Sequence, residues 1–249
     1  MRDVDDGEGF DQQVDRLAVL GEPIRRALYR YVVAQLDPVG REQAAEAVGV
    51  APHIAKFHLD KLEADGLLET EYSRPPGRGG PGAGRPAKRY RRSQLELSVS
   101  LPERRYDLAG RVMAQAIAAA AESGIPIVDA LHEAAVVEGR QLGDRVAARL
   151  GRRRSPAACS HAISGVLADY GYEPRADDEA ITLINCPFHA LAEEHTELVC
   201  GMNLDLLTGM LDTCDSGGLR ASLDPAPGRC CVTLDRRRKT SATARKASS

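Results

Sequence analysis

The first part of the chain carries apolar residues at the spacing of an amphipathic helix. These apolar residues follow one another mostly at intervals of three or four positions: Leu17, Leu20, Ile24, Leu28, Tyr31 and Val32. Pro23 suits the first turn of a helix that begins after Gly21. A further helix is predicted over 41–48, and Gly49 permits the tight turn that leads into another helix at about Pro52. The pattern therefore predicts packed helices, the last two of them crossed.

The last of these helices has one apolar and one polar face. The predicted buried positions share helical spacing: Ala55, Leu59 and Leu62. The predicted exposed face holds His53, Lys56, Phe57 and Asp60. A DNA major groove admits such a helix, so His53 and Lys56 can donate to base edges or phosphates and Phe57 can touch a thymine methyl group. Lys61 is predicted to meet phosphate. A helical hairpin with ordinary solvated residues is the alternative.

Two short strands are predicted to follow, over 67–72 and 88–91, with a loop rich in glycine and proline between them. The candidate DNA contacts of this loop and the second strand are Arg74, Arg78, Arg85, Lys88 and Arg89. The loop buries nothing, yet its arginines can follow a phosphate backbone or enter a narrow minor groove. Gly84-Arg85-Pro86 is similar to the core of an AT-hook, although a disordered linker explains three residues equally well.

The second half of the chain mixes helical and strand-like patterns. Helices are predicted over 108–122, 126–150 and 156–170, a strand over 181–185, and a hairpin from 219–223 and 230–234. The first two helices are candidates for pairing two subunits. Ala135, Gly139 and Gly143 recur at intervals of four and are predicted to let another backbone or a ligand approach closely, with packing as the favoured interpretation. This half is therefore predicted to be α+β with an antiparallel sheet.

Charge is segregated along the 249 residues, which suffice for two modest domains. Within a net charge of −3, residues 73–92 hold seven basic residues and no acidic one. Basic charge confined to a stripe and a tail favours a specific nucleic-acid binder, because the acidic remainder discourages indiscriminate binding to polyanions. The predicted organisation is a disordered acidic N-terminus (1–13), a winged-helix domain (14–92), a linker (93–105), a sensing and dimerisation domain (106–234) and a disordered basic tail (235–249).

The cellular compartment bears on the chemistry of the cysteines. The acidic N-terminus has no signal-peptide core and no apolar run reaches membrane-spanning length, so a cytoplasmic protein that contacts no membrane is expected. Six cysteines in a reducing compartment are expected to be thiols or metal ligands rather than a disulfide framework.

Three chain segments bring cysteines that can form one site. Cys186 ends a predicted strand before Pro187, Cys200 lies on a helical segment, and Cys230 opens a strand of the hairpin. Strand alternation predicts Cys230 on the core face and Cys231 on the other. Thiolates from a loop, a helix and a strand make a soft site, suited to an iron–sulfur cluster or zinc.

Other interpretations of these cysteines stay open. A compact Cys₂His₂ zinc site can be formed by Cys186, His189, His195 and Cys200. All the cysteines can instead be small core residues, which is the interpretation favoured for Cys159 and Cys214. Cys186 and His189 can be a nucleophile and its base, but no orienting group or oxyanion cradle is evident, so an enzyme is not expected.

Two families resemble parts of this sequence. The order helix, turn, helix, strand, basic loop, strand over about residues 14–92 resembles the winged helix of bacterial ArsR/DeoR-like regulators, and AKFHLDKLEADGLLE is close to their recognition helix and the strand after it. NCPFHALAEEHTELVCGMNL followed by PGRCCVTL resembles the SufR-like iron–sulfur-cluster-sensing repressors, particularly their actinobacterial members.

The second resemblance implies a homodimeric repressor whose affinity for operator DNA depends on a 4Fe–4S or 2Fe–2S cluster. The implied ligands are Cys186, Cys200 and Cys230, with Cys231 as an alternate for the third and His189 or His195 as candidates for a fourth. Two-fold symmetry of the dimer predicts an inverted-repeat operator in double-stranded DNA. A zinc or thiol-redox sensor of the same shape is the rival hypothesis.

Overall fold

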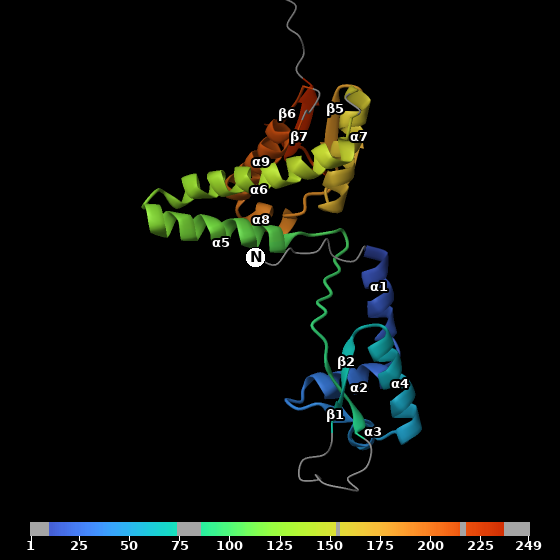
Figure 1. Ribbon diagram of the computed structural model, residues 1–249. Helices are drawn as coiled ribbons and strands as arrows, with labels where there is room; N and C mark the ends of the chain where they lie inside the picture. The colour runs from blue at the N-terminus through green and yellow to red at the C-terminus, as the bar shows by residue number, and fades with distance from the viewer. Residues whose placement is uncertain (1–9, 74–85, 153–154, 215–217, 237–249) are drawn as a thin grey trace, which may run out of the picture. The chain divides into compact units, whose positions relative to one another are not determined.

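The computed structural model describes residues 10–73, 86–152, 155–214 and 218–236 (Figure 1). The chain divides into two compact units, Met1–Val99 and Ser100–Ser249. The division falls inside the segment predicted to be a linker. Leu95 and Leu97 from that segment pack against the core of the first unit, so its beginning is ordered by apolar contacts.

The first unit combines helices with a three-stranded antiparallel sheet in the order β1-β3-β2. Its elements are α1 (Phe10–Val19), α2 (Pro23–Val33), β1 (Val39–Gly40), α3 (Arg41–Val48), α4 (Pro52–Ala64), β2 (Leu68–Ser73) and β3 (Ala87–Arg92). Strands β2 and β3 are in register, with Thr70 opposite Tyr90. The core lies between the sheet and the helices, and Leu28, Leu59 and Leu62 are fully buried in it.

Local chemistry explains where these helices begin and end. The Glu22 carboxylate accepts hydrogen bonds from the backbone N–H groups of Ile24 and Arg25 at 3.0 and 2.6 Å, and Pro23 occupies the first turn of α2. Gly49 has φ of 75°, a left-handed conformation that glycine adopts at no steric cost, and it ends α3 as predicted.

Two features of the first unit differ from the predictions. Helix α1 begins at Phe10, inside the segment predicted to be disordered over 1–13, and Val19 at its end is buried against the core. The helical periodicity from residue 17 belongs to two helices, because the chain turns between Val19 and Pro23. Strand β1 has only two residues, too few for alternation to be visible in the sequence.

The second unit combines helices with a four-stranded antiparallel sheet in the order β4-β5-β7-β6. Its elements are α5 (Tyr106–Ser123), α6 (Ile127–Leu150), α7 (Pro156–Asp169), β4 (Pro174–Ala176), β5 (Ala180–Leu183), α8 (His189–Glu194), α9 (Thr196–Thr213), β6 (Leu219–Leu223) and β7 (Val232–Arg236). Among the described residues, no helix has both the length and the apolar character needed to cross a membrane. Helices α5, α6 and α9 lie side by side in Figure 1, and one core joins them to the sheet.

Glycines set the distance between α6 and α9. A Cβ atom added at Gly139 would lie 2.0 Å from the carbonyl oxygen of Leu206, and one added at Gly209 would lie 2.4 Å from that of Val136. Real Cβ atoms do not approach other atoms so closely, so backbone contacts backbone along this interface. The packing role predicted for Gly139 and Gly143 is therefore confirmed. This contact fixes the position of α9, which carries Cys200.

Candidate functional site

Four of the cysteines converge in the second unit. Cys186 follows β5, Cys200 lies on α9, and Cys230 and Cys231 directly precede β7. Interactions with the thiols of Cys186 and Cys231 lower the pKa of Cys230. Cys200 contributes to the raised pKa of both Cys186 and Cys231. The four thiols therefore lie near one another.

Backbone hydrogen bonds hold the two loops that carry three of these thiols. The Cys230 N–H donates to the carbonyl of Leu183 on β5 at 2.8 Å, and the Asp224 N–H donates to the carbonyl of Cys231 at 2.8 Å. The first bond ties the hairpin loop to the end of β5, after which Cys186 follows. The two loops are therefore fixed next to each other by the sheet.

A second set of bonds ties the Cys186 loop to the beginning of the second unit. Arg104 donates from Nη1 to the carbonyl of Cys186 at 3.1 Å and to the side chain of Asn185. The Asn185 amide donates in turn to the carbonyls of Glu103 and Gly171 at 2.9 and 2.5 Å. The Arg105 N–H donates to the carbonyl of Pro187 at 3.0 Å. Residues 103–105 thus bond directly to the loop that carries a cysteine.

Strand β7 begins later than the sequence predicts. Its first residue is Val232, so Cys230 and Cys231 belong to the loop after the turn at Gly228. Strand alternation applies only to extended, paired residues and does not place these two side chains. Cys230 is 1% exposed in the apolar core, as predicted, and Cys231 is partly buried against the same core.

Polar donors surround the Cys230 sulfur. The Asn203 side chain on α9 donates from Nδ2 to Cys230 Sγ at 3.3 Å, and the Tyr172 hydroxyl donates to Asn203 Oδ1 at 2.6 Å. Asn203 is 1% exposed and Tyr172 is fully buried. Because Tyr172 occupies the amide oxygen, the amide nitrogen is turned toward the sulfur. The sequence analysis missed both residues, although an asparagine among apolar positions one turn after Cys200 was a usable signal.

These contacts distribute protons unequally among the thiols. Hydrogen bonds from Cys186 and Cys231 lower the pKa of Cys230 despite its burial. The backbone N–H of Val232 and the Asn203 amide act in the same direction. Hydrogen bonding to Cys230, together with burial, raises the pKa of Cys186 and that of Cys231. Cys230 is therefore the sulfur that the others stabilise as a thiolate.

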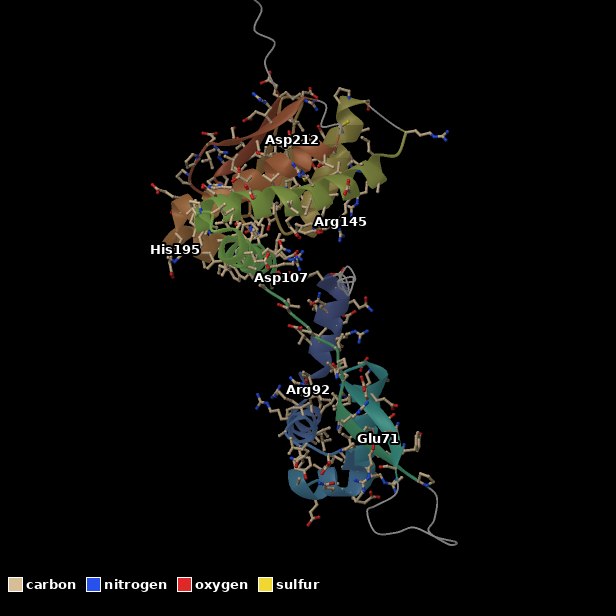
Figure 2. The ribbon with its side chains drawn as sticks, turned by 60° about the vertical axis from the view of Figure 1, so that its left-hand side comes forward. Glu71, Arg92, Asp107, Arg145, His195 and Asp212 are labelled. Atoms are coloured by element: carbon tan, nitrogen blue, oxygen red, sulfur yellow. The ribbon has the colours of Figure 1, made fainter. Side chains whose placement is uncertain are left out.

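The histidines considered as ligands lie elsewhere. His189 is exposed and its Nε2 lies 3.3 Å from a carboxylate oxygen of Glu193. His195 is exposed at the end of α8 (Figure 2). The thiol contacts include neither imidazole. Cys159 and Cys214 are 1% and 6% exposed in the apolar core, which confirms their assignment as core residues.

The described residues are not already arranged around a metal ion. Within the described ranges, no group of three or more His, Cys, Asp and Glu side chains is placed to hold one. His189 and His195 are exposed, so the compact Cys₂His₂ zinc site considered above is not formed. Binding of one metal centre by the cysteines would require their thiols to move closer together.

The exposed face of α4 holds three of the predicted DNA contacts. His53, Lys56 and Phe57 are exposed, and Phe57 keeps 64% of its surface accessible. Lys56 forms an ion pair with Asp60 at 2.7 Å, and Lys61 forms one with Asp65 at 3.1 Å. Arg74, Arg78 and Arg85 lie outside the described residues.

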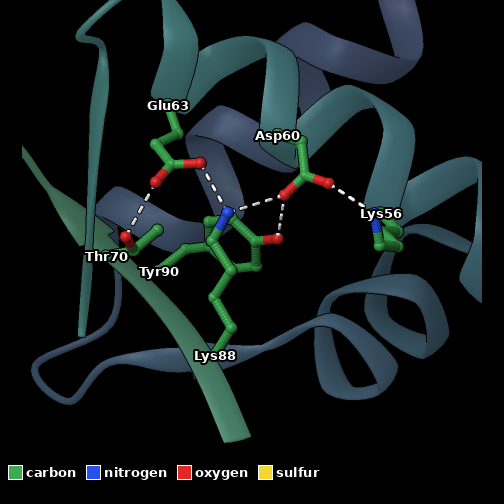
Figure 3. A network of polar contacts seen from close by, with 6 residues as sticks. All are labelled: Lys56, Asp60, Glu63, Thr70, Lys88 and Tyr90. Atoms are coloured by element: carbon green, nitrogen blue, oxygen red, sulfur yellow. Dashed lines mark hydrogen bonds and ion pairs between the residues drawn. The ribbon is translucent and has the colours of Figure 1, made fainter. Parts of the chain in front are cut away.

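Asp60 and Lys88 belong to a network between α4 and β3 rather than to the exposed face (Figure 3). Lys88 lies 2.9 Å from Asp60 and 2.5 Å from Glu63, and the Tyr90 hydroxyl donates to Asp60 at 2.6 Å. Burial alone would raise the pKa of Asp60. Hydrogen bonds from Lys56, Tyr90 and Lys88 outweigh this effect and hold that pKa well below its usual range. The predicted exposure of Asp60 was wrong, because β3 crosses close to that side of α4.

Arg89 is also turned toward the protein. Its guanidinium donates to the carbonyl of Pro38 at 3.1 Å, and its Nε atom is buried. Lys88 and Arg89 thus join β3 to α4 and to the segment before β1, and their predicted role as DNA contacts finds no support in these interactions.

No protein-family model, curated protein or solved structure matches the chain. Function is therefore inferred from the residues and their contacts.

Proposed function

We propose that this chain is a homodimeric, winged-helix transcriptional regulator whose affinity for operator DNA is controlled by an iron–sulfur cluster on its C-terminal cysteines. The observation that carries the proposal is the convergence of thiols from three distant chain segments in one unit. The other unit has the element order of a DNA-binding module. The resemblance to SufR-like repressors is compatible with both observations.

The first unit supports the DNA-binding part of the proposal. Helices α3 and α4 are joined by a tight turn at Gly49, and the β2–β3 hairpin follows, which is the element order of a winged helix. Helix α4 presents His53, Lys56 and Phe57 to solvent. In this proposal α4 enters a major groove, while Arg74, Arg78 and Arg85 contact phosphate or the minor groove.

Truncation of Phe57 tests the groove-facing role of α4. We expect Phe57→Ala to weaken operator binding by about tenfold, on the order of 1 kcal/mol, because a contact with a base edge is lost. The matched control is Leu36→Ala, since Leu36 is a fully exposed apolar residue in the loop between α2 and β1. Titration of labelled promoter DNA by fluorescence anisotropy measures both. Equal affinities of the two variants would contradict the assignment of α4.

Cysteine sulfurs suit both zinc and an iron–sulfur cluster, and the resemblance to SufR-like repressors is the reason for proposing a cluster. Thiolate sulfurs are the usual protein ligands of such clusters, and hydrogen bonds to these sulfurs tune them. Here the Asn203 amide donates to the Cys230 sulfur at 3.3 Å. Bound at this site, a cluster supplies one-electron redox chemistry and sensitivity to iron and oxidants. Cys186, Cys200 and Cys230 would hold it, as the resemblance implies.

The bonds around Cys186 suggest how the site can act on DNA binding. The Arg104 side chain donates to the carbonyl of Cys186, and the Arg105 N–H donates to the carbonyl of Pro187. Residues 103–105 come directly after the point at which the chain passes from the first unit to the second. A change in the Cys186 loop therefore changes the order of the connecting segment. Differential affinity requires such a difference between the loaded and the empty protein.

An uncharged surface of α5 supports the dimer. Between Arg111 and Glu122 this helix carries no charged residue, and Ile117 is 57% exposed in the middle of that stretch. Exposed apolar surface of this kind is typical of a contact between proteins. In a two-fold dimer each subunit offers one α4, so the operator is expected to be an inverted repeat.

Comparison of loaded and empty protein tests the proposed switch. We expect the anaerobically reconstituted protein to differ from the cluster-free protein in operator affinity by roughly 5- to 150-fold, the usual range of coupling between two sites. Both forms are titrated against the promoter of their own gene under anaerobic conditions. Equal affinity would exclude switching, and a colourless protein with stoichiometric zinc would favour the zinc-sensor hypothesis.

A further inference from the structure

We propose that Lys56 binds a guanine base in the major groove and that Asp60 is the positioning residue that directs it there. This inference rests on the proposed DNA-binding role of α4 and specifies the base pair that the helix recognises. The sequence leaves open whether Lys56 meets a base edge or a phosphate. Its contacts in the folded unit favour the base edge, and they predict a G·C pair in each half of the operator.

Asp60 is fixed from the side of the sheet. Its Oδ1 atom accepts hydrogen bonds from the Tyr90 hydroxyl at 2.6 Å and from Lys88 Nζ at 2.9 Å. Tyr90 is 2% exposed, and Lys88 also pairs with Glu63 at 2.5 Å. These bonds set the orientation of the Asp60 carboxylate, whose second oxygen is directed toward Lys56 (Figure 3).

This second oxygen holds the Lys56 ammonium group. Lys56 Nζ donates to Asp60 Oδ2 at 2.7 Å, while 55% of the Lys56 side chain stays accessible. An ammonium group has three N–H donors, so two remain for a ligand. In the major groove guanine presents two neighbouring acceptors, N7 and O6, whereas adenine places a donor beside its N7. The remaining donors of Lys56 therefore match the edge of guanine.

The charge around Lys56 disfavours a phosphate at the same place. The network of Figure 3 contains two lysines and two carboxylates, so its formal charges cancel. A phosphate that approached Lys56 would also meet the Asp60 carboxylate, 2.7 Å from the ammonium, and like charges repel. A guanine edge has no net charge and requires directed donors rather than an excess of positive charge. Lys56 is thus better suited to a base than to the DNA backbone.

Selection of operator sequences tests the guanine contact. The full chain selects duplexes from a random DNA library, and fluorescence anisotropy measures the affinity for each selected duplex. We expect an inverted repeat with a G·C pair in each half. Replacing this pair by A·T should weaken binding of the unmodified protein by about 5- to 150-fold, the usual discrimination of a good base contact. The same replacement should have almost no effect on Lys56→Met, because the group that recognises guanine is gone.

Two variants separate a base contact from a phosphate contact. Lys61→Met removes another lysine of α4, which pairs with Asp65 at 3.1 Å. Lys61 is predicted to meet phosphate, so this variant should bind all duplexes more weakly by the same factor and keep the preference for G·C. Lys56→Arg keeps paired donors for guanine and should restore the preference that Lys56→Met loses.

Asp60→Asn tests the positioning role. The asparagine oxygen can still accept from Tyr90, but the amide nitrogen cannot accept from Lys56, which becomes an unpaired cation. We expect this variant to lose the preference for G·C and to bind non-operator DNA more tightly. Its plot of log affinity against log salt should be steeper by about 0.9, the effect of one added phosphate contact. A merely structural defect would weaken binding without these changes. If Asp60→Asn does not fold, Tyr90→Phe removes one bond that fixes Asp60 and should lose part of the preference.

Each contrary result points to a different part of the proposal. If Lys56→Met bound all duplexes more weakly by one factor, or if the selected half-sites shared no G·C pair, the guanine contact would be overturned. Full preference for G·C in Asp60→Asn, or in Tyr90→Phe in its place, would overturn the positioning role. These results leave the proposed regulator intact. An unmodified protein that selects no DNA sequence would overturn the proposed function, and this inference with it.

Discussion

Alanine at position 139 is expected to lower the free energy of unfolding of the second unit by about 3 kcal/mol or more. A Cβ atom there would lie 2.0 Å from the Leu206 carbonyl oxygen, and the obstacle is backbone rather than a flexible side chain. Helices α6 and α9 must therefore separate. Because α9 carries Cys200 and Asn203, cluster uptake should fall together with stability. Urea unfolding followed by circular dichroism measures the first effect, and iron content after reconstitution measures the second.

Gly110→Ala is the matched control for this change. Gly110 lies inside α5, and an added Cβ atom meets nothing within 4 Å. We expect this variant to gain about 0.5–1 kcal/mol, because alanine restricts the unfolded chain and favours the helix. If Gly139→Ala were as stable as Gly110→Ala, the two helices would not be held at backbone contact. Gly209→Ala should behave like Gly139→Ala, since its Cβ atom would lie 2.4 Å from the Val136 carbonyl oxygen.

The sequence was sufficient for elements whose pattern is local. Apolar spacing and Gly49 located α2, α3 and α4, because a helix buries one face and ends where a left-handed residue is tolerated. The same reasoning located α6 and β6 closely. Cys186, Cys200 and Cys230 were selected instead by their residue type and by the resemblance to SufR-like repressors.

Contacts between distant segments could not be predicted in this way. Lys88 looked like part of a basic stripe, yet it meets Asp60 and Glu63, because β3 crosses α4 in the folded unit. Strand β7 begins two residues later than predicted, because its start depends on pairing with β6 and not on the local sequence pattern alone. Arg104 and Cys186 are 82 positions apart in the sequence, so no periodic pattern of residues predicts their hydrogen bond.

This last contact has a large expected consequence for regulation. Replacing Arg104 by methionine removes the guanidinium that bonds both Asn185 and the Cys186 carbonyl, while the remaining apolar stem keeps part of the packing. We expect the ratio of operator affinities between loaded and empty protein to fall from roughly 5- to 150-fold toward one. Cluster content should be preserved, because no thiol is removed. Anaerobic anisotropy titrations, combined with iron and sulfide analysis of the same samples, measure both quantities.

Two further variants test whether the Arg104 guanidinium itself couples cluster binding to operator affinity. Arg149→Met removes an arginine that pairs with Asp169 on the same unit but does not contact the Cys186 loop, so its affinity ratio should equal that of the unmodified protein. Arg104→Lys keeps one charged donor near the carbonyl and should retain part of the ratio, because an ammonium cannot reproduce the fork of a guanidinium. If Arg104→Met and Arg149→Met showed the same ratio of operator affinities between loaded and empty protein, the contact of Arg104 with the Cys186 loop would not couple the two sites. The state of the cluster would then have to reach DNA through the dimer surface of α5 instead.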